Sequence, residues 1–341
     1  MNLEDIAKEA GVSRSTVSRV INNDGYVSKE TRARVLEIVE RLNFSPNHAA
    51  RTLVTQRSNV ISVVISTVEV FFGDNSYFPM LLQGIAKAAN DHDYGILLWL
   101  GQTGEDPEHF SQRILRNRMT DGLILASIAY DNPLFERLAH SIPHFVPVER
   151  PLIFEDIVSY VTIDNLKAGQ IATEHLINLG YQRIAHITGR MTIADAIDRF
   201  NGYRLALEKA GKPYDEKLVV YADFDDPSGY QAMQTLIHQK PDAIFIASDT
   251  AAIGAMRFIH ESGLRVPEDI AIVGFDDLDV AEKSNPPLTT IRQPVQEKGA
   301  AAVNLLLDLI NETKKSPSQV ILPIQLVIRE SCGAKKLTVS I

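Results

Sequence analysis

The chain has 341 residues and a formal net charge of −9 at pH 7; 45% of the residues are hydrophobic and 23% are charged. These values are typical of a soluble globular protein with two or three domains, and the acidic balance excludes a nucleic-acid coat along the whole chain. The single cysteine, Cys332, excludes an intramolecular disulfide, and no apolar run reaches the roughly 18 residues of a membrane span.

Charge is distributed unevenly between the first part of the chain and the rest. Residues 1–57 contain nine Lys and Arg against seven Asp and Glu, whereas the remainder contains 25 against 36. A mildly basic head on an acidic body indicates that the head meets a polyanion. The start, MNLEDIAKEAG, lacks the basic stretch and apolar segment of a signal peptide, so we expect a cytoplasmic protein in which Cys332 is structural.

Three short helices are predicted in the head. Gly11 ends the first helix, because glycine adopts the left-handed conformation at low cost. Ser13 and Ser28 are natural N-caps for the second and third. The buried stripes are predicted to be Leu3, Ile6, Ala7 and Ala10; Val17, Val20 and Ile21; and Val35, Leu36, Val39 and Leu42. Short helices separated by a tight glycine turn predict a helix-turn-helix unit.

The second helix carries small polar and basic side chains outside its buried stripe, namely Arg14, Ser15, Thr16, Ser18 and Arg19. Small hydroxyl side chains allow a helix to approach a DNA duplex closely and bond phosphates or base edges, and arginine pairs with guanine. These features favour DNA binding. The alternative from periodicity alone is a three-helix bundle whose polar face is only solvated.

The stretch LEDIAKEAGVSRSTVSRVIN resembles the signature of the LacI family of bacterial transcription regulators, and VSKETRARV and LNFSPNHAARTL resemble that family too. The resemblance implies that Arg14 and Ser15 choose the operator bases and that Arg19 is a shared base-reading position. The residues that would hold the DNA backbone and orient the helix are Thr16, Ser18 and Asn22. A buried role for Thr16 stays open.

The segment FSPNHAARTLVTQRS follows the head. Ser45 and Pro46 suit the start of a helix of two turns, which is too short to be stable alone and is therefore a candidate switch. The family resemblance implies that two such helices, one per protomer, pair in the minor groove, where Leu53 wedges between base steps. Packing of Leu53 against the body is the alternative. Further residues expected to contact phosphate or groove are Asn47, His48 and Arg51.

From residue 59 onward, strands and helices are predicted to alternate. The predicted strands are 60–66, 95–100, 121–127, 144–149, 160–164, 183–188, 218–223, 242–248, 269–275 and 320–329. The predicted helices are 79–92, 107–117, 166–179, 196–210, 228–239, 250–262 and 294–313. Such alternation predicts parallel sheets covered on both faces, here two doubly wound α/β subdomains in tandem, with ligands bound beyond the C-terminal ends of the strands.

The body resembles the periplasmic sugar-binding-protein fold that this family carries as its sensor. The resemblance rests on YVTIDNLKAGQIATEHLINLGYQRIAHITG, VGFDD, NPPLTTIRQP and RESC. It implies three crossings of the chain between an N-subdomain and a C-subdomain. The expected organisation is a head at 1–45, a hinge helix and linker at 46–58, an N-subdomain at 59–160 with 277–292 and 320–329, and a C-subdomain at 161–276 with 293–319.

The same resemblance implies an effector site between the subdomains. Arg199 matches the ligand-anchoring arginine and Asp276 the hydroxyl-binding aspartate, and a cationic fork beside a carboxylate suits adjacent hydroxyls. Phe224 matches an aromatic residue that stacks on the ligand, and Tyr77 and Phe78 match an aromatic pair at the mouth of the N-subdomain. Aromatic residues with a charged pair favour a sugar; a nucleobase is the alternative ligand.

Several of these residues have structural alternatives. Arg199 and Asp276 could form a structural ion pair, and Phe224 could belong to the core. Carboxylates also follow predicted strands at Asp249, Glu149 and Asp164, and Asp249 and Glu149 are further candidate effector-binding residues. We expect Asp164 to cap the next helix, and Asp277 is a turn residue or a ligand. Glu149 stands where the family usually has an aspartate, and TVEVFFGDNSYFPM is longer than the family pattern, which loosens the alignment of Tyr77 and Phe78.

The predicted function is a DNA-binding transcription regulator, a repressor, controlled by a small ligand that is a sugar. Its partners would be operator DNA and a second copy of the chain, since palindromic operators are read by two heads. A protein corepressor is the alternative regulator, and a sugar-binding enzyme is the alternative from a different class of function. The sequence contains no Gly-rich phosphate loop, metal-spaced His/Cys cluster or nucleophile elbow, so we expect no cofactor, no metal and no enzymatic activity.

Overall fold

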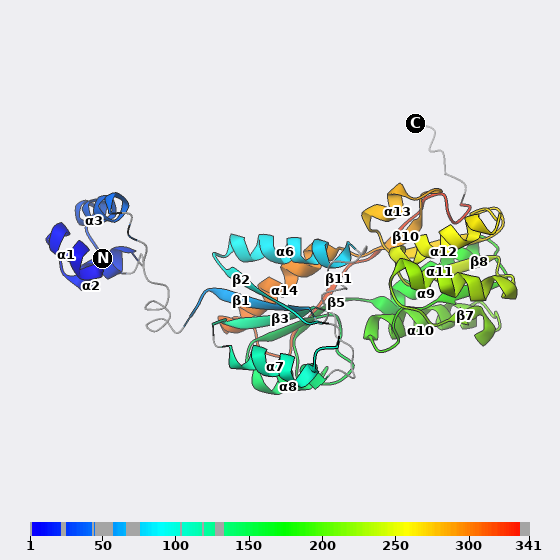
Figure 1. Cartoon of the computed structure of the whole chain (residues 1–341), viewed down its shortest axis with the longest axis horizontal. Helices are drawn as coiled ribbons and strands as arrows, with labels where there is room; N and C mark the ends of the chain where they lie inside the picture. Colours follow the sequence, from blue (N-terminus) through cyan, green and yellow to red (C-terminus); the bar gives the residue numbers. More distant parts are fainter. Residues whose placement is uncertain are drawn as a thin grey trace. The chain divides into compact units, whose positions relative to one another are not determined.

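A computed structural model describes residues 2–21, 25–42, 44, 57–65, 76–102, 104–117, 119–126 and 133–334. The chain divides into two units, a head over Met1–Ser58 and a body over Asn59–Ile341 (Figure 1). Within the described residues, no helix is both long and apolar enough to cross a membrane.

The head is built from helices α1 (Leu3–Ala10), α2 (Arg14–Ile21) and α3 (Lys29–Arg41). Gly11 has φ 64° at the end of α1, and Ser13 and Ser28 accept backbone hydrogen bonds in the first turns of α2 and α3. The buried core of the head consists of Ile6, Ala7, Ala10, Val17, Val20, Val35 and Ile38.

The prediction that Leu36 belongs to the buried core of the head is wrong. Leu36 is 44% exposed, whereas its neighbour Ile38 is buried. Positions 35, 38 and 42 lie on one face of a helix with 3.6 residues per turn, and position 36 is turned about 100° away from position 35. A single extra leucine in an apolar run is therefore a weak guide to the buried face.

The body contains two six-stranded sheets. The N-subdomain sheet has the order β11-β5-β4-β3-β1-β2 and the C-subdomain sheet the order β12-β10-β9-β8-β6-β7. The strands of the first are β1 (Val60–Ile65), β2 (Gly95–Leu100), β3 (Gly122–Ala126), β4 (Phe145–Val148), β5 (Tyr160–Ile163) and β11 (Gln319–Leu322). Those of the second are β6 (Ile184–Ile187), β7 (Val219–Val220), β8 (Ala243–Ile246), β9 (Ala271–Asp276), β10 (Thr289–Arg292) and β12 (Gln325–Val327).

Helices cover both faces of each sheet, as the predicted fold class requires (Figure 1). The N-subdomain has α6 (Tyr77–Asp91) and α14 (Val295–Ile310) on one face and α7 (Pro107–Arg116) and α8 (Pro133–Ser141) on the other. The C-subdomain has α9 (Asn165–Asn178) with α10 (Ala194–Lys209), and α11 (Asp226–Leu236) with α12 (Asp249–Glu261). The short α13 (Asp279–Lys283) follows β9.

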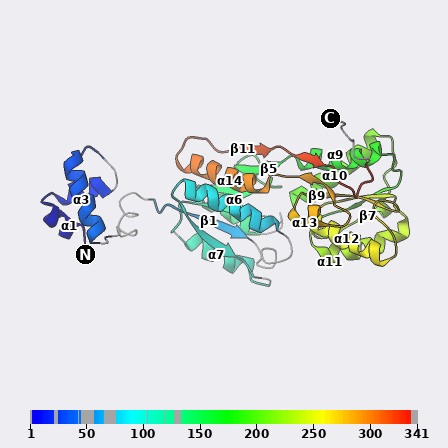
Figure 2. The ribbon, with the colours of Figure 1, turned by 90° about the horizontal axis from the view of Figure 1, so that it is seen from above.

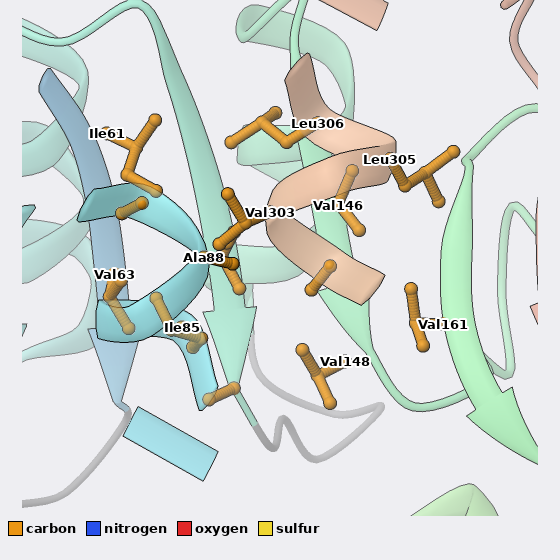
Figure 3. Close-up of a cluster of buried hydrophobic side chains, with 14 of the residues drawn as sticks. Ile61, Val63, Ile85, Ala88, Val146, Val148, Val161, Val303, Leu305 and Leu306 are labelled. Carbon is orange, nitrogen blue, oxygen red and sulfur yellow. The ribbon is translucent and has the colours of Figure 1, made fainter. Parts of the chain in front are cut away.

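The N-subdomain core lies between its sheet and the helices α6 and α14. Ile61 and Val63 of β1, Ile85 of α6 and Val303 of α14 pack in one apolar cluster (Figure 3). Helices α6 and α14 approach so closely that a Cβ on Gly84 would lie 1.9 Å from the backbone oxygen of Gln296. Only glycine permits that contact, which fixes the position of α14, and with it Lys298, against the sheet.

The structure corrects the expected assignment of the last segments. Residues 289–292 form β10 beside β9 in the C-subdomain, and 295–310 form α14 in the core of the N-subdomain, the reverse of the expectation for 277–292 and 293–319. The predicted strand 320–329 is two strands, β11 and β12, in different sheets. An apolar pattern shows that a segment is buried but not which of two similar sheets buries it. The sequence pattern therefore does not show to which subdomain these last segments belong.

The strands β11 and β12 decide how the two sheets face each other. β11 pairs parallel with β5, whereas β12 pairs antiparallel with β10. The two strands follow one another with two residues between them and continue in one direction (Figure 2). The parallel strands of the two sheets therefore run toward each other, and the C-terminal ends of both sets lie at the junction between the subdomains.

Candidate functional site

The polar face of α2 is the candidate DNA-contacting surface. Arg14, Ser15 and Arg19 are exposed, whereas Thr16 and Ser18 are partly buried. The hydroxyl of Ser13 lies 2.7 Å from that of Ser15 and 2.9 Å from that of Thr16. The start of α2 thus presents a cluster of hydroxyl groups, and the same helix carries two exposed guanidinium groups.

Arg14 and Arg19 each have a neighbouring residue within the head. Arg14 Nη1 lies 3.7 Å from Glu4 Oε1 in an exposed ion pair, which is worth little and is easily exchanged for a phosphate or a base. The side chain of Arg19 lies beside Gly25, where a Cβ would be 3.5 Å from Arg19 Cδ. The other predicted DNA contacts, Asn22, Asn47, His48, Arg51 and Leu53, lie outside the described residues.

The junction between the subdomains is the second candidate site. On the N-subdomain side, Glu149 follows β4 with φ 112° and accepts hydrogen bonds from Tyr77 Oη at 2.6 Å and from Lys298 Nζ at 2.8 Å. Burial alone would raise the pKa of Glu149, but Lys298 and the hydrogen bonds lower it to about 2. Glu149 is therefore ionised and paired with a fully buried lysine.

On the C-subdomain side, the centre of the site is Arg199 on α10, which is 3% exposed. Its Nε donates to Asn165 Oδ1 at 2.9 Å and its Nη1 to the carbonyl oxygen of Ala247 at 2.7 Å. Nη2 lies 3.5 Å from Asp195 Oδ2, and Nη1 lies 4.0 Å from Asp276 Oδ1. A guanidinium held by this many fixed partners is rigid, as an anchoring group must be.

Hydrogen bonds and ion pairs between described residues connect the subdomains. Gln293 accepts a hydrogen bond from Lys298 Nζ and donates one to Asp276 Oδ1, so that its amide joins the two halves of the site. Farther out, Arg150 makes a bidentate ion pair with Asp198 of α10, with two N–O distances of 2.9 Å. Of the predicted effector residues, Tyr77, Glu149, Arg199 and Asp276 are thus part of one polar network.

A pocket lies next to this network. Its polar lining comes from Glu149 and Arg150, and Ala194 at the start of α10 closes it from the C-subdomain. The remaining lining residues are apolar: Leu125, Phe135, Pro147, Val148, Pro151, Leu152 and Ile153. Of the predicted effector residues, only Glu149 lines this pocket.

The predicted effector residues separate into two groups. Tyr77, Glu149, Arg199 and Asp276 belong to the network, and Phe224 is half-buried with its ring centre 5.9 Å from Arg199 Cζ. The role of each in ligand binding stays a prediction.

Phe78 and Asp249 are placed differently. Phe78 is buried in the N-subdomain core. The carboxylate of Asp249 accepts hydrogen bonds from Leu278 N at 2.9 Å and Thr290 Oγ1 at 2.6 Å, which ties the ends of β8, β9 and β10 together. These contacts favour structural roles for both residues.

Two open alternatives have structural answers. Asp164 accepts a hydrogen bond from Lys167 N at 2.8 Å and caps α9, as expected. Asp277, with φ 59°, pairs with Arg292 and Arg329, so its carboxylate is occupied within the C-subdomain. Cys332 is fully buried and lies 3.3 Å from His175 Nε2, which suits the structural role predicted for it.

Sequence reasoning missed Asp195, Gln293 and Lys298. Asp195 precedes Arg199 by one helical turn, and this spacing places both side chains on one face of α10. Gln293 follows directly after β10, so the rule that ligand-binding residues follow strands would have found it once β10 was recognised. Lys298 carries no such signal. No group of His, Cys, Asp and Glu suited to a metal ion occurs in the described part of the chain.

Comparison with known proteins identifies the architecture. Residues 2–47 match the family described as bacterial regulatory proteins, lacI family, and residues 173–332 match a periplasmic binding protein-like domain. The HTH-type transcriptional regulator CelR of Thermobifida fusca is 40% identical over 332 residues, covering 96% of this chain and 97% of CelR.

Two solved structures extend the comparison over nearly the whole chain. A structure of a CelR–cellobiose complex has a TM-score of 0.77 and 37% identity, covering 97% of this chain and 99% of the other. A lac repressor dimer bound to operator and the anti-inducer ONPF has a TM-score of 0.84 and 28% identity, covering 98% and 99%. With its helix-turn-helix head and two-subdomain body, the chain belongs to the LacI family of bacterial transcription regulators.

Proposed function

We propose that this chain is a homodimeric repressor whose affinity for operator DNA is set by a sugar bound at the subdomain junction, with cellobiose as the first compound to test. The observation that carries the proposal is the convergence of Arg199, Asp276 and Phe224 at the C-terminal ends of the C-subdomain strands, opposite Glu149 and Tyr77. Relatives support it, because CelR is 40% identical and a CelR–cellobiose complex shares the fold.

The chemistry of the site agrees with a sugar. Carboxylates accept hydrogen bonds from hydroxyls, guanidinium and ammonium groups donate them, and an aromatic ring packs on the apolar face of a sugar ring. A ligand that replaces part of the network between the subdomains changes the free energy of one subdomain orientation relative to another. The resulting change in DNA affinity corresponds to a coupling free energy on the order of 1–3 kcal/mol.

The proposal includes the finer features of the protein. The lac repressor structure is that of a dimer on its operator, and we propose the same pairing here, with Arg14, Ser15 and Arg19 at the bases and Leu53 in the minor groove. We place the protein in the cytoplasm, where the bacterial chromosome lies. We also propose that the junction binds its ligand without converting it, so that cellobiose is recovered unchanged after incubation.

The test is an operator-binding titration with fluorescence anisotropy, using DNA from the promoter of the chain's own gene and a panel of mono- and disaccharides. We expect one sugar, cellobiose first, to shift the operator Kd by about tenfold, which corresponds to about 1.4 kcal/mol. Operator binding with no response to any sugar would overturn the sugar assignment and direct the search to nucleobases and a protein corepressor.

Two variants assign the response to the two sites. Arg199→Ala should remove the sugar response and keep operator binding. Leu53→Ala should weaken operator binding and keep sugar binding, measured by calorimetry. A normal sugar response in Arg199→Ala would show that the anchor lies elsewhere, and unchanged operator affinity in Leu53→Ala would remove the wedge role.

A further inference from the structure

Glu149 is an ionised carboxylate in surroundings that favour a protonated one. It lines the pocket, and its carboxyl group shares a hydrogen bond with that of Asp195 on α10. Burial and an adjacent carboxyl group both favour the neutral form of an acid. For Asp195 these two causes raise the pKa well above its usual range, whereas for Glu149 the charge of Lys298 outweighs burial and lowers the pKa. Of the two carboxyl groups, Asp195 therefore holds the proton.

Lys298 is the cation paired with this carboxylate. Its Nζ lies 2.8 Å from Glu149 Oε1, whereas the neighbouring Arg150 is bonded to Asp198 and Glu155. Lys298 is fully buried and does not line the pocket, although Glu149 does. The ammonium group therefore lies behind the carboxylate as seen from the pocket, and it acts on a ligand in the pocket through Glu149.

The packing of α14 fixes the position of this ammonium group. The next residue is Gly299, where a Cβ would lie 2.3 Å from the backbone oxygen of Leu81, so the side chain of Lys298 starts at a close contact between α14 and α6. Its Nζ also donates to Tyr77 Oη at 3.4 Å and to Gln293 Oε1. Together with Glu149, these partners come from α6, the end of β4 and the link before α14. A group held from three sides keeps its geometry when a ligand enters.

We propose that Lys298 is a positioning residue of the sugar site, which holds the Glu149 carboxylate in place as a hydrogen-bond acceptor for a ligand hydroxyl. This inference rests on the proposed sugar-binding function and adds a residue that lies behind the site. A carboxylate only accepts hydrogen bonds, whereas a protonated carboxyl group also donates one, so the charge of Lys298 decides how a ligand hydroxyl must point. Without that charge, burial and Asp195 would leave Glu149 protonated near neutral pH.

Other titratable and charged groups also surround Glu149. They are Lys298 on α14, Tyr77 on α6, Asp195 and Arg199 on α10, and Asp276 at the end of β9. Because the pKa values of Asp195 and Asp276 are themselves raised, sugar affinity of the wild type can depend on pH through them. The quantity that reports on Lys298 is therefore the ratio of the variant Kd to the wild-type Kd at each pH.

The experiment measures the Kd of cellobiose by calorimetry on the full-length protein at pH 6 and pH 8.5. In Lys298→Met, Glu149 should hold a proton at pH 6 and lose it toward pH 8.5. This variant should bind cellobiose at least about tenfold more weakly than wild type at pH 6, and the ratio should shrink at least about threefold by pH 8.5. Lys298→Arg keeps the cation, so its ratio should change by less than about twofold. Lys87→Met, which removes an exposed lysine of α6, is the control and should bind like wild type.

A double-variant cycle shows whether Lys298 acts through Glu149. Once Glu149→Gln has removed the carboxylate, adding Lys298→Met should change the Kd at pH 6 by less than about threefold, against at least about tenfold in the wild-type background. The double variant contains neither buried charge, so this comparison decides by itself should Lys298→Met alone be too unstable to purify. Operator binding by each variant reports that it is folded.

The possible outcomes separate this inference from the proposed function. Lys298→Met that binds within about threefold of wild type, or that is weakened equally at both pH values, would overturn the positioning role while leaving sugar binding in place. A further loss of about tenfold in the Glu149→Gln background would also overturn it, because Lys298 would then act by another route. Failure of the wild type to bind cellobiose, with operator binding intact, would overturn the assignment of the sugar itself and the inference built on it.

Discussion

The two subdomains of the body have the same strand order but differ in one edge strand and in the charges that they bring to their junction. In each sheet, numbered along its own strands, the order is 6-5-4-3-1-2, yet the sixth strand is parallel in the N-subdomain and antiparallel in the C-subdomain. That single reversal allows a nearly straight chain to pass from one sheet to the other. It also turns the ligand-binding ends of both sheets toward each other.

The two subdomains also differ in the charged side chains that they place at the junction. The N-subdomain contributes Glu149 and Lys298, an ion pair that is neutral by itself. The C-subdomain contributes three aspartates, Asp195, Asp249 and Asp276, for one arginine. Burial raises the pKa of each of these aspartates. The two halves should therefore respond differently when a cation is removed, because the C-subdomain carboxyls already have raised pKa values, whereas Glu149 is ionised beside Lys298.

The largest effect is expected from Lys298→Met. Glu149 would remain buried with no cation, and protonating it at pH 7 is costly, so the free energy of unfolding should fall by about 3–5 kcal/mol. Urea unfolding of the variant measures the loss. Lys87→Met, which removes the exposed ion pair with Asp91 in the same subdomain, is the control and should change stability by less than about 0.5 kcal/mol. A loss below about 1 kcal/mol in Lys298→Met would contradict the buried-pair interpretation.

Arg199→Met should cost less, about 2 kcal/mol at pH 7, because the lost hydrogen bonds to Asn165 and the Ala247 carbonyl dominate. The carboxyls of Asp195 and Asp276 would respond by binding protons. The destabilisation should accordingly be smaller at pH 5 than at pH 8 when urea unfolding is measured at both. An equal loss at the two pH values would show that these aspartates do not compensate.

Asp276→Asn tests directly whether the C-subdomain buries more carboxyl groups than its one arginine can neutralise. Burial raises the pKa of Asp276 to about 6, although Arg199, Gln293 and Lys298 oppose the shift and Glu149 adds to it. A carboxyl with a raised pKa stabilises the fold fully below its unfolded pKa near 4, and this contribution is lost as the pH rises through about 6. Between pH 4 and pH 7 the wild type should therefore lose about 1–3 kcal/mol more stability than the variant. Parallel stability curves would contradict this assignment.

The smallest effect on stability is expected from Arg150→Met. The ion pair of Arg150 with Asp198 joins the subdomains, but the two side chains are 26% and 19% exposed, so its loss should cost less than about 1 kcal/mol. Because the pair spans the junction, sugar affinity should nevertheless change several-fold. Arg265→Met, which affects an exposed pair with Asp269 inside the C-subdomain, should leave sugar affinity unchanged. Equal sugar affinities in both variants would show that Arg150 does not couple the subdomains.

Most of the architecture follows from patterns in the sequence. The head follows from Gly11, Ser13 and Ser28, because capping chemistry is local and the residues that end a helix lie next to it. Most of the strands also follow, since a parallel sheet buried on both faces requires continuous apolar runs. The comparison with relatives confirms the family that the head motif indicated.

The remaining features depend on contacts that are distant in the sequence. Lys298 lies in the apolar helix α14, and its pairing with Glu149, 149 positions away, has no local signal. The sheet that holds β10 is likewise decided by pairing with β9, because a four-residue strand carries too little pattern to show it. A role inferred from a position after a strand, such as that of Asp249, depends on the surroundings of the residue, in this case Thr290 and the backbone of Leu278.

The three connections between the subdomains limit the kind of movement that a ligand can cause. One residue separates β5 from α9, and two residues separate β10 from α14 and β11 from β12. An extended residue spans at most about 3.6 Å, so three such short links leave no slack for sliding by more than a few ångströms. Two of the links also contain a proline, Pro294 and Pro323, whose φ is fixed. The subdomains can therefore pivot about these links but not slide past one another, and a ligand signal must leave the junction as a rotation.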